Sequence, residues 1–215
     1  MSIPPKVILI VLIIIGLQLA FGLQQYLSHE RKKTAPANKT NAVSAPAMPL
    51  SDFRLIDQKG RSFTPENLKN RWSFVFFGYM NCPDICPTTL SIMQQVWRQL
   101  RADKADMKQR QMIFVSVDPE RDQPQQLQDY LAYFDPTFIG VTGNPDEIDK
   151  LANQTGILYG YEDADEETGN YIVNHNVQIL LFDPQARLQT ALSPPFDSAT
   201  IVHKLQSLQS NAGKT

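Results

Sequence analysis

Residues 74–90 read FVFFGYMNCPDICPTTL and contain both cysteines of the chain, Cys82 and Cys86. The run before the cysteines is apolar and unbroken, which is typical of a strand buried on both faces. After the cysteines, apolar residues recur at helical spacing. The stretch therefore predicts a buried strand, a loop with two thiols and a helix. Taken alone, it leaves three uses of the thiols open: a structural disulfide, a redox dithiol or a soft-metal site.

Further strands and helices alternate along the chain. Buried strands are expected at residues 73–79, 111–117, 138–143 and 177–182, and helices at residues 90–100, 127–134, 145–154 and 198–209. This alternation predicts an α/β fold with a mainly parallel central sheet. Residues 53–64 have the pattern of an N-terminal hairpin, and residues 187–192 can return as the hairpin partner of the last buried strand.

The composition fits one globular domain of ordinary size. The chain has 215 residues, 42% of them hydrophobic, so a core can form without disulfide staples. The net charge is −2, and residues 1–49 hold five Lys or Arg against one Glu, which leaves −6 for the remainder. This distribution argues against a nucleic-acid-binding protein, which would need a basic face.

The N-terminal region has the pattern of a membrane anchor. Residues 7–23 are apolar except for Gln18, and as a helix they span about 25 Å, close to the thickness of a membrane core. A cleaved signal peptide is the alternative, but the nearest A-x-A patterns lie well past the apolar run. The chain is then divided into an N-terminal tail (residues 1–6), a transmembrane anchor (7–27), a flexible, disordered tether (28–49), a globular domain (50–210) and a C-terminal tail (211–215).

Candidate site residues follow from the expected sheet. Sites in such sheets form at the carboxyl ends of strands, where the cysteine loop and Asp118 both lie, so we expect them to be neighbours. Cys82 and Cys86 share one face at the start of a helix, where the helix dipole favours a thiolate. His175 is the remaining candidate ligand, although a lone histidine before a strand is more often structural. Two thiolates and one imidazole would form a soft set that selects copper over zinc. Residues 120–122 are expected to form a solvated charge cluster.

Four stretches in the same order resemble one protein family: FFGYMNCPDICPTTL, VSVDPERDQP, YLAYFDPTFIGVTG and YIVNHN followed by a hydrophobic strand. The family is Sco/SenC, the membrane-anchored copper proteins of cytochrome c oxidase assembly, and the resemblance covers residues 50–205. It implies a thioredoxin-like fold in which Cys82, Cys86 and His175 bind Cu(I) or Cu(II). It also implies that Asp118 lies beside these ligands and assists loading; the alternative is an Asp-Pro turn that ends a strand.

The chain departs from the family pattern at three places. Met80 and Asn81 replace Thr-His or a similar pair, and Asn174 replaces the Asp that commonly precedes the ligand histidine. Gln185-Ala186 stands in a turn where an acidic residue and a glycine are usual. Met80 is expected to pack against the sheet; the alternative is a soft contact of its thioether with copper.

The resemblance implies a metallochaperone, and not an enzyme in the strict sense. It would pass copper, received from an upstream donor protein, to the dinuclear copper site of cytochrome c oxidase subunit II. The alternative is a thiol-disulfide oxidoreductase in which Cys82 attacks, Cys86 resolves in a redox-active disulfide, and the cysteines of that target site are kept reduced. Redox members of the thioredoxin superfamily usually have a proline where this chain has residues 173–177. This stretch has His175 and no proline, which favours metal transfer.

The expected location rests on the resemblance. The positive charges that flank the anchor, counted alone, place the large domain in the cytoplasm. The resemblance implies the periplasm or the mitochondrial intermembrane space instead, and the chain lacks an Arg-rich, acid-poor presequence. We therefore expect a single-pass protein of a bacterial inner membrane with its soluble domain in the periplasm.

Overall fold

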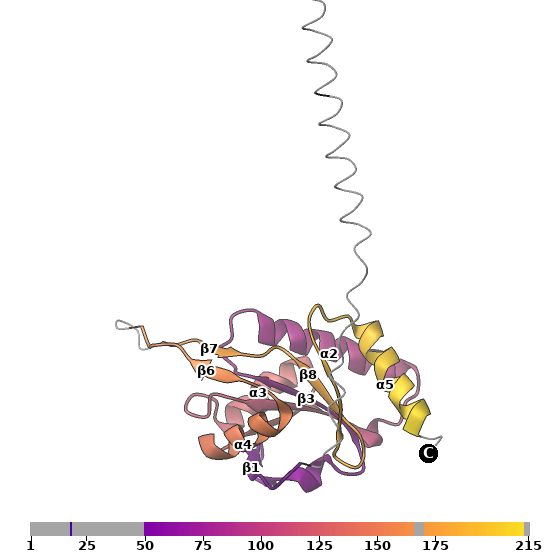
Figure 1. The fold of residues 1–215 in the computed structure, drawn as a ribbon, viewed down its shortest axis with the longest axis horizontal. Coiled ribbons are helices and arrows are strands. Elements are labelled where there is room, and N and C mark those ends of the chain that lie inside the picture. Colours follow the sequence, from indigo (N-terminus) through magenta and orange to yellow (C-terminus); the bar gives the residue numbers. More distant parts are fainter. Residues whose placement is uncertain (1–17, 19–49, 166–169, 213–215) are drawn as a thin grey trace, which may run out of the picture. The chain divides into compact units, whose positions relative to one another are not determined.

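The computed structural model describes residues 50–165 and 170–212, together with Gln18 (Figure 1). The chain divides into two compact units, residues 1–41 and 42–215, and the fold below belongs to the second unit. Within the described residues, no helix is both long and apolar enough to span a membrane. Apart from Gln18, the predicted anchor and tether lie outside the described residues, so both remain predictions.

A seven-stranded mixed sheet forms the centre of the domain (Figure 1). Its order is β2-β1-β5-β4-β3-β8-β9. The strands are β1 (Leu55–Asp57), β2 (Ser62–Phe63), β3 (Trp72–Gly78), β4 (Arg110–Ser116), β5 (Ile139–Thr142), β8 (Ile179–Phe182) and β9 (Leu188–Leu192). Only β3, β4 and β5 run parallel to one another, and every other neighbouring pair is antiparallel.

The expectation of a mainly parallel sheet is therefore wrong, and the connections explain why. Parallel neighbours need a crossover, and the helices α2 (Ile85–Ala102) and α3 (Pro124–Phe134) supply the two that exist. The hairpins at both edges, β1–β2 and β8–β9, are confirmed, and hairpins pair their strands antiparallel. The sheet thus has a parallel centre extended on both sides by antiparallel strands.

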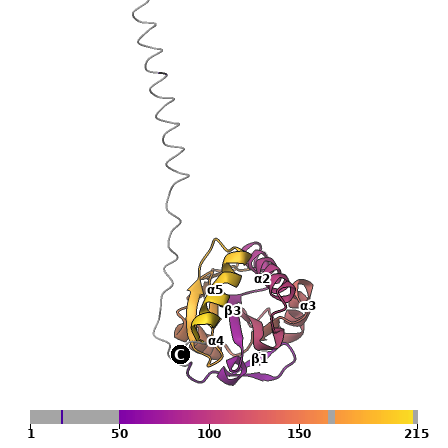
Figure 2. The same cartoon turned by 90° about the vertical axis from the view of Figure 1, so that its right-hand side faces the viewer.

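The core lies between the sheet and its helices. All seven residues of β3 are buried, and Phe76 pairs in register with Phe114 of β4. Trp97 of α2 packs edge-on against Phe74, with ring centroids 5.6 Å apart, and against Phe138. Figure 2 shows α2 between α3 and the last helix, α5 (Ser198–Ala212). This packing fixes the start of α2, and with it the cysteine loop, at the end of β3.

A second, two-stranded sheet stands apart from the first. It consists of β6 (Tyr159–Tyr161) and β7 (Val173–His175), which pair antiparallel and extend to one side of the domain in Figure 1. They follow the helix α4 (Pro145–Thr155). The sequence pattern does not indicate these strands, because each is only three residues long. His175 is the last residue of β7 and lies opposite Tyr159.

Candidate metal centre

The two cysteines lie where β3 gives way to α2. Cys82 is in the connecting turn, and Cys86 is the second residue of the helix. The backbone N–H of Cys86 donates to the Sγ atom of Cys82 over 3.4 Å, so a free amide at the helix start faces this thiol. Gly78 makes room for the arrangement, because a Cβ atom there would lie 2.9 Å from the Sγ atom of Cys86.

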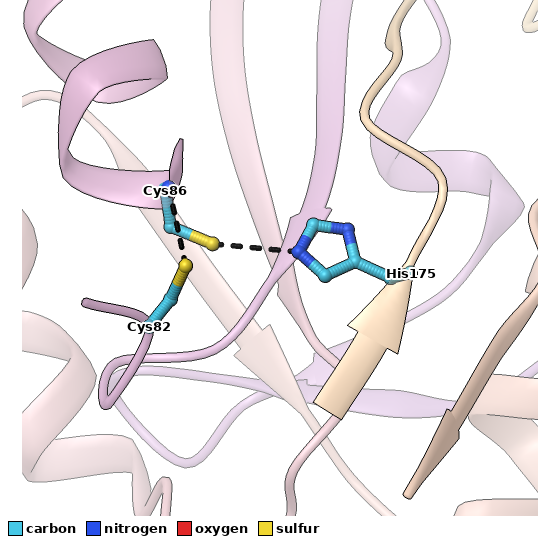
Figure 3. A group of neighbouring side chains, drawn as sticks. All are labelled: Cys82, Cys86 and His175. Atoms are coloured by element: carbon cyan, nitrogen blue, oxygen red, sulfur yellow. Dashed lines mark hydrogen bonds between the residues drawn. The ribbon is translucent and has the colours of Figure 1, made fainter. Parts of the chain in front are cut away.

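His175 completes the group from a distant part of the chain (Figure 3). Its Nε2 atom lies 3.5 Å from the Sγ atom of Cys86, and the three candidate ligand atoms all lie within 4.8 Å of one another. Metal–ligand bonds of about 2.0–2.3 Å, as known for zinc, would place the donors of a three-coordinate ion about 3.5–4 Å apart. Among the residues that the structure describes, this is the only such cluster of Cys, His or acidic side chains.

Both thiols are free and buried, Cys86 completely and Cys82 with 8% of its surface exposed. Burial raises the pKa of Cys86, although a hydrogen bond from the backbone of Tyr79 acts in the opposite direction. At Cys86, burial therefore opposes the thiolate that the start of a helix is expected to favour. A bound cation would reverse this balance, since metal binding drives the proton off a thiol.

The ring of His175 is oriented for ligation. Its Nδ1 atom lies 3.0 Å from the carbonyl oxygen of Asn176, which can only accept, so Nδ1 carries the hydrogen and Nε2 presents its lone pair to the sulfur atoms. Burial lowers the pKa of His175, which keeps the ring neutral. The rings of Phe76 and Tyr79 pack edge-on against the imidazole at 6.0 and 6.2 Å between centroids.

Asp118 does not join the ligand group. It is buried, and its carboxylate accepts hydrogen bonds from Arg121 at 2.5 Å and from the Tyr171 hydroxyl at 2.7 Å. It follows β4 as predicted, but these partners, rather than the thiols, occupy its oxygens. Any part it plays in the site must act through Arg121 and Tyr171.

The expectation of a solvated cluster at residues 120–122 is wrong for Asp122. This side chain is fully buried, and its Oδ2 atom accepts from the Met80 backbone at 3.0 Å and from the Ser116 hydroxyl at 2.6 Å. Burial raises its pKa to about 6. Asp122 thus fixes the chain just before the cysteines. In the sequence, the only sign of this role is its position shortly after a buried strand.

The surroundings of Met80 and Asn174, at two of the three departures from the family pattern, are defined in the structure. Met80 is half-buried and packs against the core, as expected. The side-chain amide of Asn174 donates over 2.8 Å to Glu162, which directly follows the neighbouring strand β6. An aspartate at position 174 would instead place a second carboxylate beside that of Glu162.

The fold and the cluster together define a class: an α/β domain with a buried site of two thiols and one imidazole at the start of a helix. The family model for SCO1/SenC matches residues 42–210. The chain belongs to the SCO1/SenC family.

Individual relatives agree with this assignment. A SCO2-like protein of Rickettsia felis is 33% identical over 178 residues, which cover 82% of this chain and 85% of the relative. Two solved structures with copper bound superpose well. Bradyrhizobium japonicum ScoI has a TM-score of 0.66 at 32% identity, covering 74% of this chain and 99% of the other. Yeast Sco1 has a TM-score of 0.69 at 31% identity, covering 75% and 88%.

These similarities confirm two expectations from the sequence. The domain has the mixed α/β, thioredoxin-like architecture of Sco proteins. Copper is the metal bound in three solved homologues, in agreement with the ion that a soft sulfur and nitrogen ligand set favours.

Proposed function

We propose that this chain is a copper metallochaperone that binds Cu(I) or Cu(II) through Cys82, Cys86 and His175 and delivers it to the dinuclear copper site of cytochrome c oxidase subunit II. Copper is the cargo here, and the protein's task is to hold the ion and release it by ligand exchange. An upstream donor protein supplies the copper. Residues 7–27 anchor the chain in a bacterial inner membrane with the domain in the periplasm.

One observation carries the proposal: two buried thiols and a neutral imidazole meet within 4.8 Å. Two thiolates suit Cu(I), whereas the added nitrogen donor suits Cu(II), so the same site can hold either oxidation state. The site is also shielded, because Cys86 is fully buried and Cys82 nearly so. Exposed thiols would be oxidised more readily than these.

The position of His175 favours metal transfer over thiol exchange. Thiol-disulfide exchange requires an attacking and a leaving sulfur, and an imidazole 3.5 Å from Cys86 supplies neither. The imidazole is, however, a good metal ligand. One observation supports the alternative of a thiol-disulfide oxidoreductase: the two thiols are free and adjacent.

Replacing His175 separates the two functions. In cells whose own copy is replaced, His175→Ala should abolish copper loading of the oxidase, because Cu(II) loses its nitrogen donor. The purified variant should still form and reduce the Cys82–Cys86 disulfide at rates within about tenfold of the parent. His203, exposed on α5, provides the matched control. In cells with His203→Ala, the oxidase should mature normally.

Copper in the oxidase and thiol-exchange rates are the two quantities to measure. Normal oxidase maturation with His175→Ala, at normal protein levels and without added copper, would favour the oxidoreductase instead.

A further inference from the structure

The ligand His175 lies on a hairpin that the main sheet does not hold. Strands β6 and β7 form their own sheet, separate from the seven-stranded one that positions the cysteines. The distance between His175 and Cys86 therefore depends on whatever fastens this hairpin to the rest of the domain. Residues 176–178 join β7 to β8 of the main sheet. Side-chain contacts must fasten the rest of the hairpin, since no shared strand ladder does so among the described residues.

Arg121 makes the most extensive of these contacts. It lies in the turn after β4, and its Nη1 atom donates to the carbonyl oxygen of Tyr171 over 3.1 Å. Its guanidinium also lies 3.6 Å from the centroid of the Tyr171 ring, in the geometry of a cation–π contact. Tyr171 precedes β7 by two residues and His175 by four. The same guanidinium lies 5.8 Å from the ring of Tyr79, which itself packs on His175.

Asp118 holds Arg121 in this position. The Nε atom of Arg121 donates to Asp118 over 2.5 Å, and the Tyr171 hydroxyl donates to the other oxygen of the same carboxylate over 2.7 Å. Asp118 is fully buried, whereas 21% of the Arg121 side chain is exposed. A carboxylate buried to this extent needs its cation, and the pair therefore stays formed. On the other strand, Tyr161 donates to the carbonyl oxygen of Val117 over 2.7 Å.

We propose that Asp118, Arg121 and Tyr171 form a latch that positions His175 against the two cysteines and so sets how strongly the site holds Cu(II). The three residues do not bind copper themselves; they act through the hairpin. The inference rests on the proposed copper site. It assigns a role to the DPERD motif, residues 118–122, whose Asp118 and Arg121 hold the histidine hairpin while Asp122 holds the cysteine loop.

The latch should matter more for one oxidation state of copper than for the other. Cu(I) can remain on two thiolates, whereas Cu(II) needs the nitrogen donor that the hairpin carries. Loosening the hairpin should therefore weaken Cu(II) binding selectively. A general loss of packing around the cysteines would weaken both oxidation states equally, which makes the two explanations distinguishable.

The test uses the purified full chain with two variants of the latch. Arg121→Lys keeps a positive charge beside Asp118 but loses the planar stacking and the bond to Tyr171. Tyr171→Phe removes only the hydroxyl that donates to Asp118. Arg101→Lys is the matched control, because Arg101 pairs with the buried Asp135 on another part of the domain. Each variant is also made in the His175→Ala background.

Copper affinities are measured by competition with chelators, and hairpin opening by hydrogen exchange in the copper-free protein. We expect Cu(II) affinity to fall about tenfold to a hundredfold in the latch variants, in the range seen when partners of metal ligands are removed. Cu(I) affinity should fall less than about threefold, because both thiolates remain. Amides of β6 and β7 should exchange faster in the latch variants than in the parent. In Arg101→Lys their exchange rates should equal those of the parent.

The His175→Ala background identifies the cause. If the latch acts through His175, Arg121→Lys should cause no further loss of Cu(II) affinity in that background. A loss that persists there, an equal loss for Cu(I) and Cu(II), or an unchanged Cu(II) affinity in both latch variants would overturn the inference. If His175→Ala itself leaves Cu(II) affinity unchanged, the proposed copper site is wrong. The proposed role of the latch is then wrong as well.

Discussion

The Nε2 atom of His175 lies 3.5 Å from the Sγ atom of Cys86, although 89 residues separate them in the chain. Cys86 is placed by the junction of β3 and α2, whereas His175 is placed by the separate hairpin of β6 and β7. The site therefore forms where two different parts of the domain meet, although residues 176–178 join the hairpin to β8, the neighbour of β3. Substitutions in either part should change copper binding without touching a ligand.

Gly78 offers the first such substitution. A Cβ atom there would lie 2.9 Å from the Sγ atom of Cys86 and equally close to the Phe114 ring, so Gly78→Ala must displace one of them. We expect the free energy of unfolding to fall by about 1–3 kcal/mol, as is typical of an overpacked core. Copper affinity should fall as well, because Cys86 moves. Urea unfolding and copper competition measure the two effects.

Gly160→Ala is the control for this prediction. Gly160 lies in β6, and a Cβ atom there would have no neighbour within 4 Å. Its free energy of unfolding should change by less than about 0.5 kcal/mol. Parent-like copper binding and stability in Gly78→Ala would show that the contact with Cys86 is unimportant.

The parts of this fold that follow from local pattern could be predicted from the sequence. The run of apolar residues in β3, the helix that follows the cysteine loop and the hairpins at both edges of the sheet all carry strong local signals, and the structure confirms them. The direction of β8 relative to β3 could not be predicted in the same way. Parallel and antiparallel neighbours can have the same spacing of hydrophobic residues. A mixed sheet therefore could not be predicted from the local pattern.

Asp122 predicts a distinctive dependence of stability on pH. Burial raises its pKa from the usual 3.8 to about 6, so the folded state keeps this proton at pH values where the unfolded state has released it. The folded state binds more protons between about pH 4 and pH 6, and the free energy of unfolding contributed by this group falls as the pH rises through that window. A shift of this size corresponds to about 1–3 kcal/mol.

Asp122→Asn should remove this fall, since an amide does not titrate and its oxygen can still accept from Met80. Relative to the parent, the variant should gain stability between pH 4 and pH 7 in urea unfolding. Asp135→Asn should show the opposite trend, at pH values below about 4, because the pKa of Asp135 is lowered from its usual 3.8. Burial alone would raise the pKa of Asp135, but hydrogen bonds from Arg101 and Thr137 lower it overall, so its contribution is lost as the pH falls. Identical pH profiles for the parent and Asp122→Asn would refute the assignment.

Met80 is predicted to act through packing. Its side chain is half-buried against the core, and its backbone N–H is held by Asp122. Met80→Thr should therefore lower the free energy of unfolding while leaving the ratio of Cu(I) to Cu(II) affinity unchanged. Met80→Leu, which keeps the apolar volume, should restore most of the stability. A selective loss of Cu(I) affinity in Met80→Thr would instead indicate a soft contact of the thioether with copper.

The candidate ligands and Asp118 could be named from the sequence, but the contacts through which the supporting residues act could not. Cys82, Cys86 and His175 were selected by residue type and by motif order, and the structure brings all three together. The roles of Asp118 and Asp122 depend on which way each side chain turns after β4, and this is decided by Arg121, Tyr171 and the Met80 backbone. Such tertiary partners lie up to 53 residues away and leave no local pattern.

The most direct test of the copper site is the copper content of the full chain, purified under reducing conditions and compared with its single-cysteine variants. We expect one copper per chain in the parent and in His203→Ala, with a strong thiolate charge-transfer absorption in the Cu(II) form. We expect loss of this copper in both Cys82→Ser and Cys86→Ser. A full equivalent of copper retained by either cysteine variant would contradict the assignment of the site.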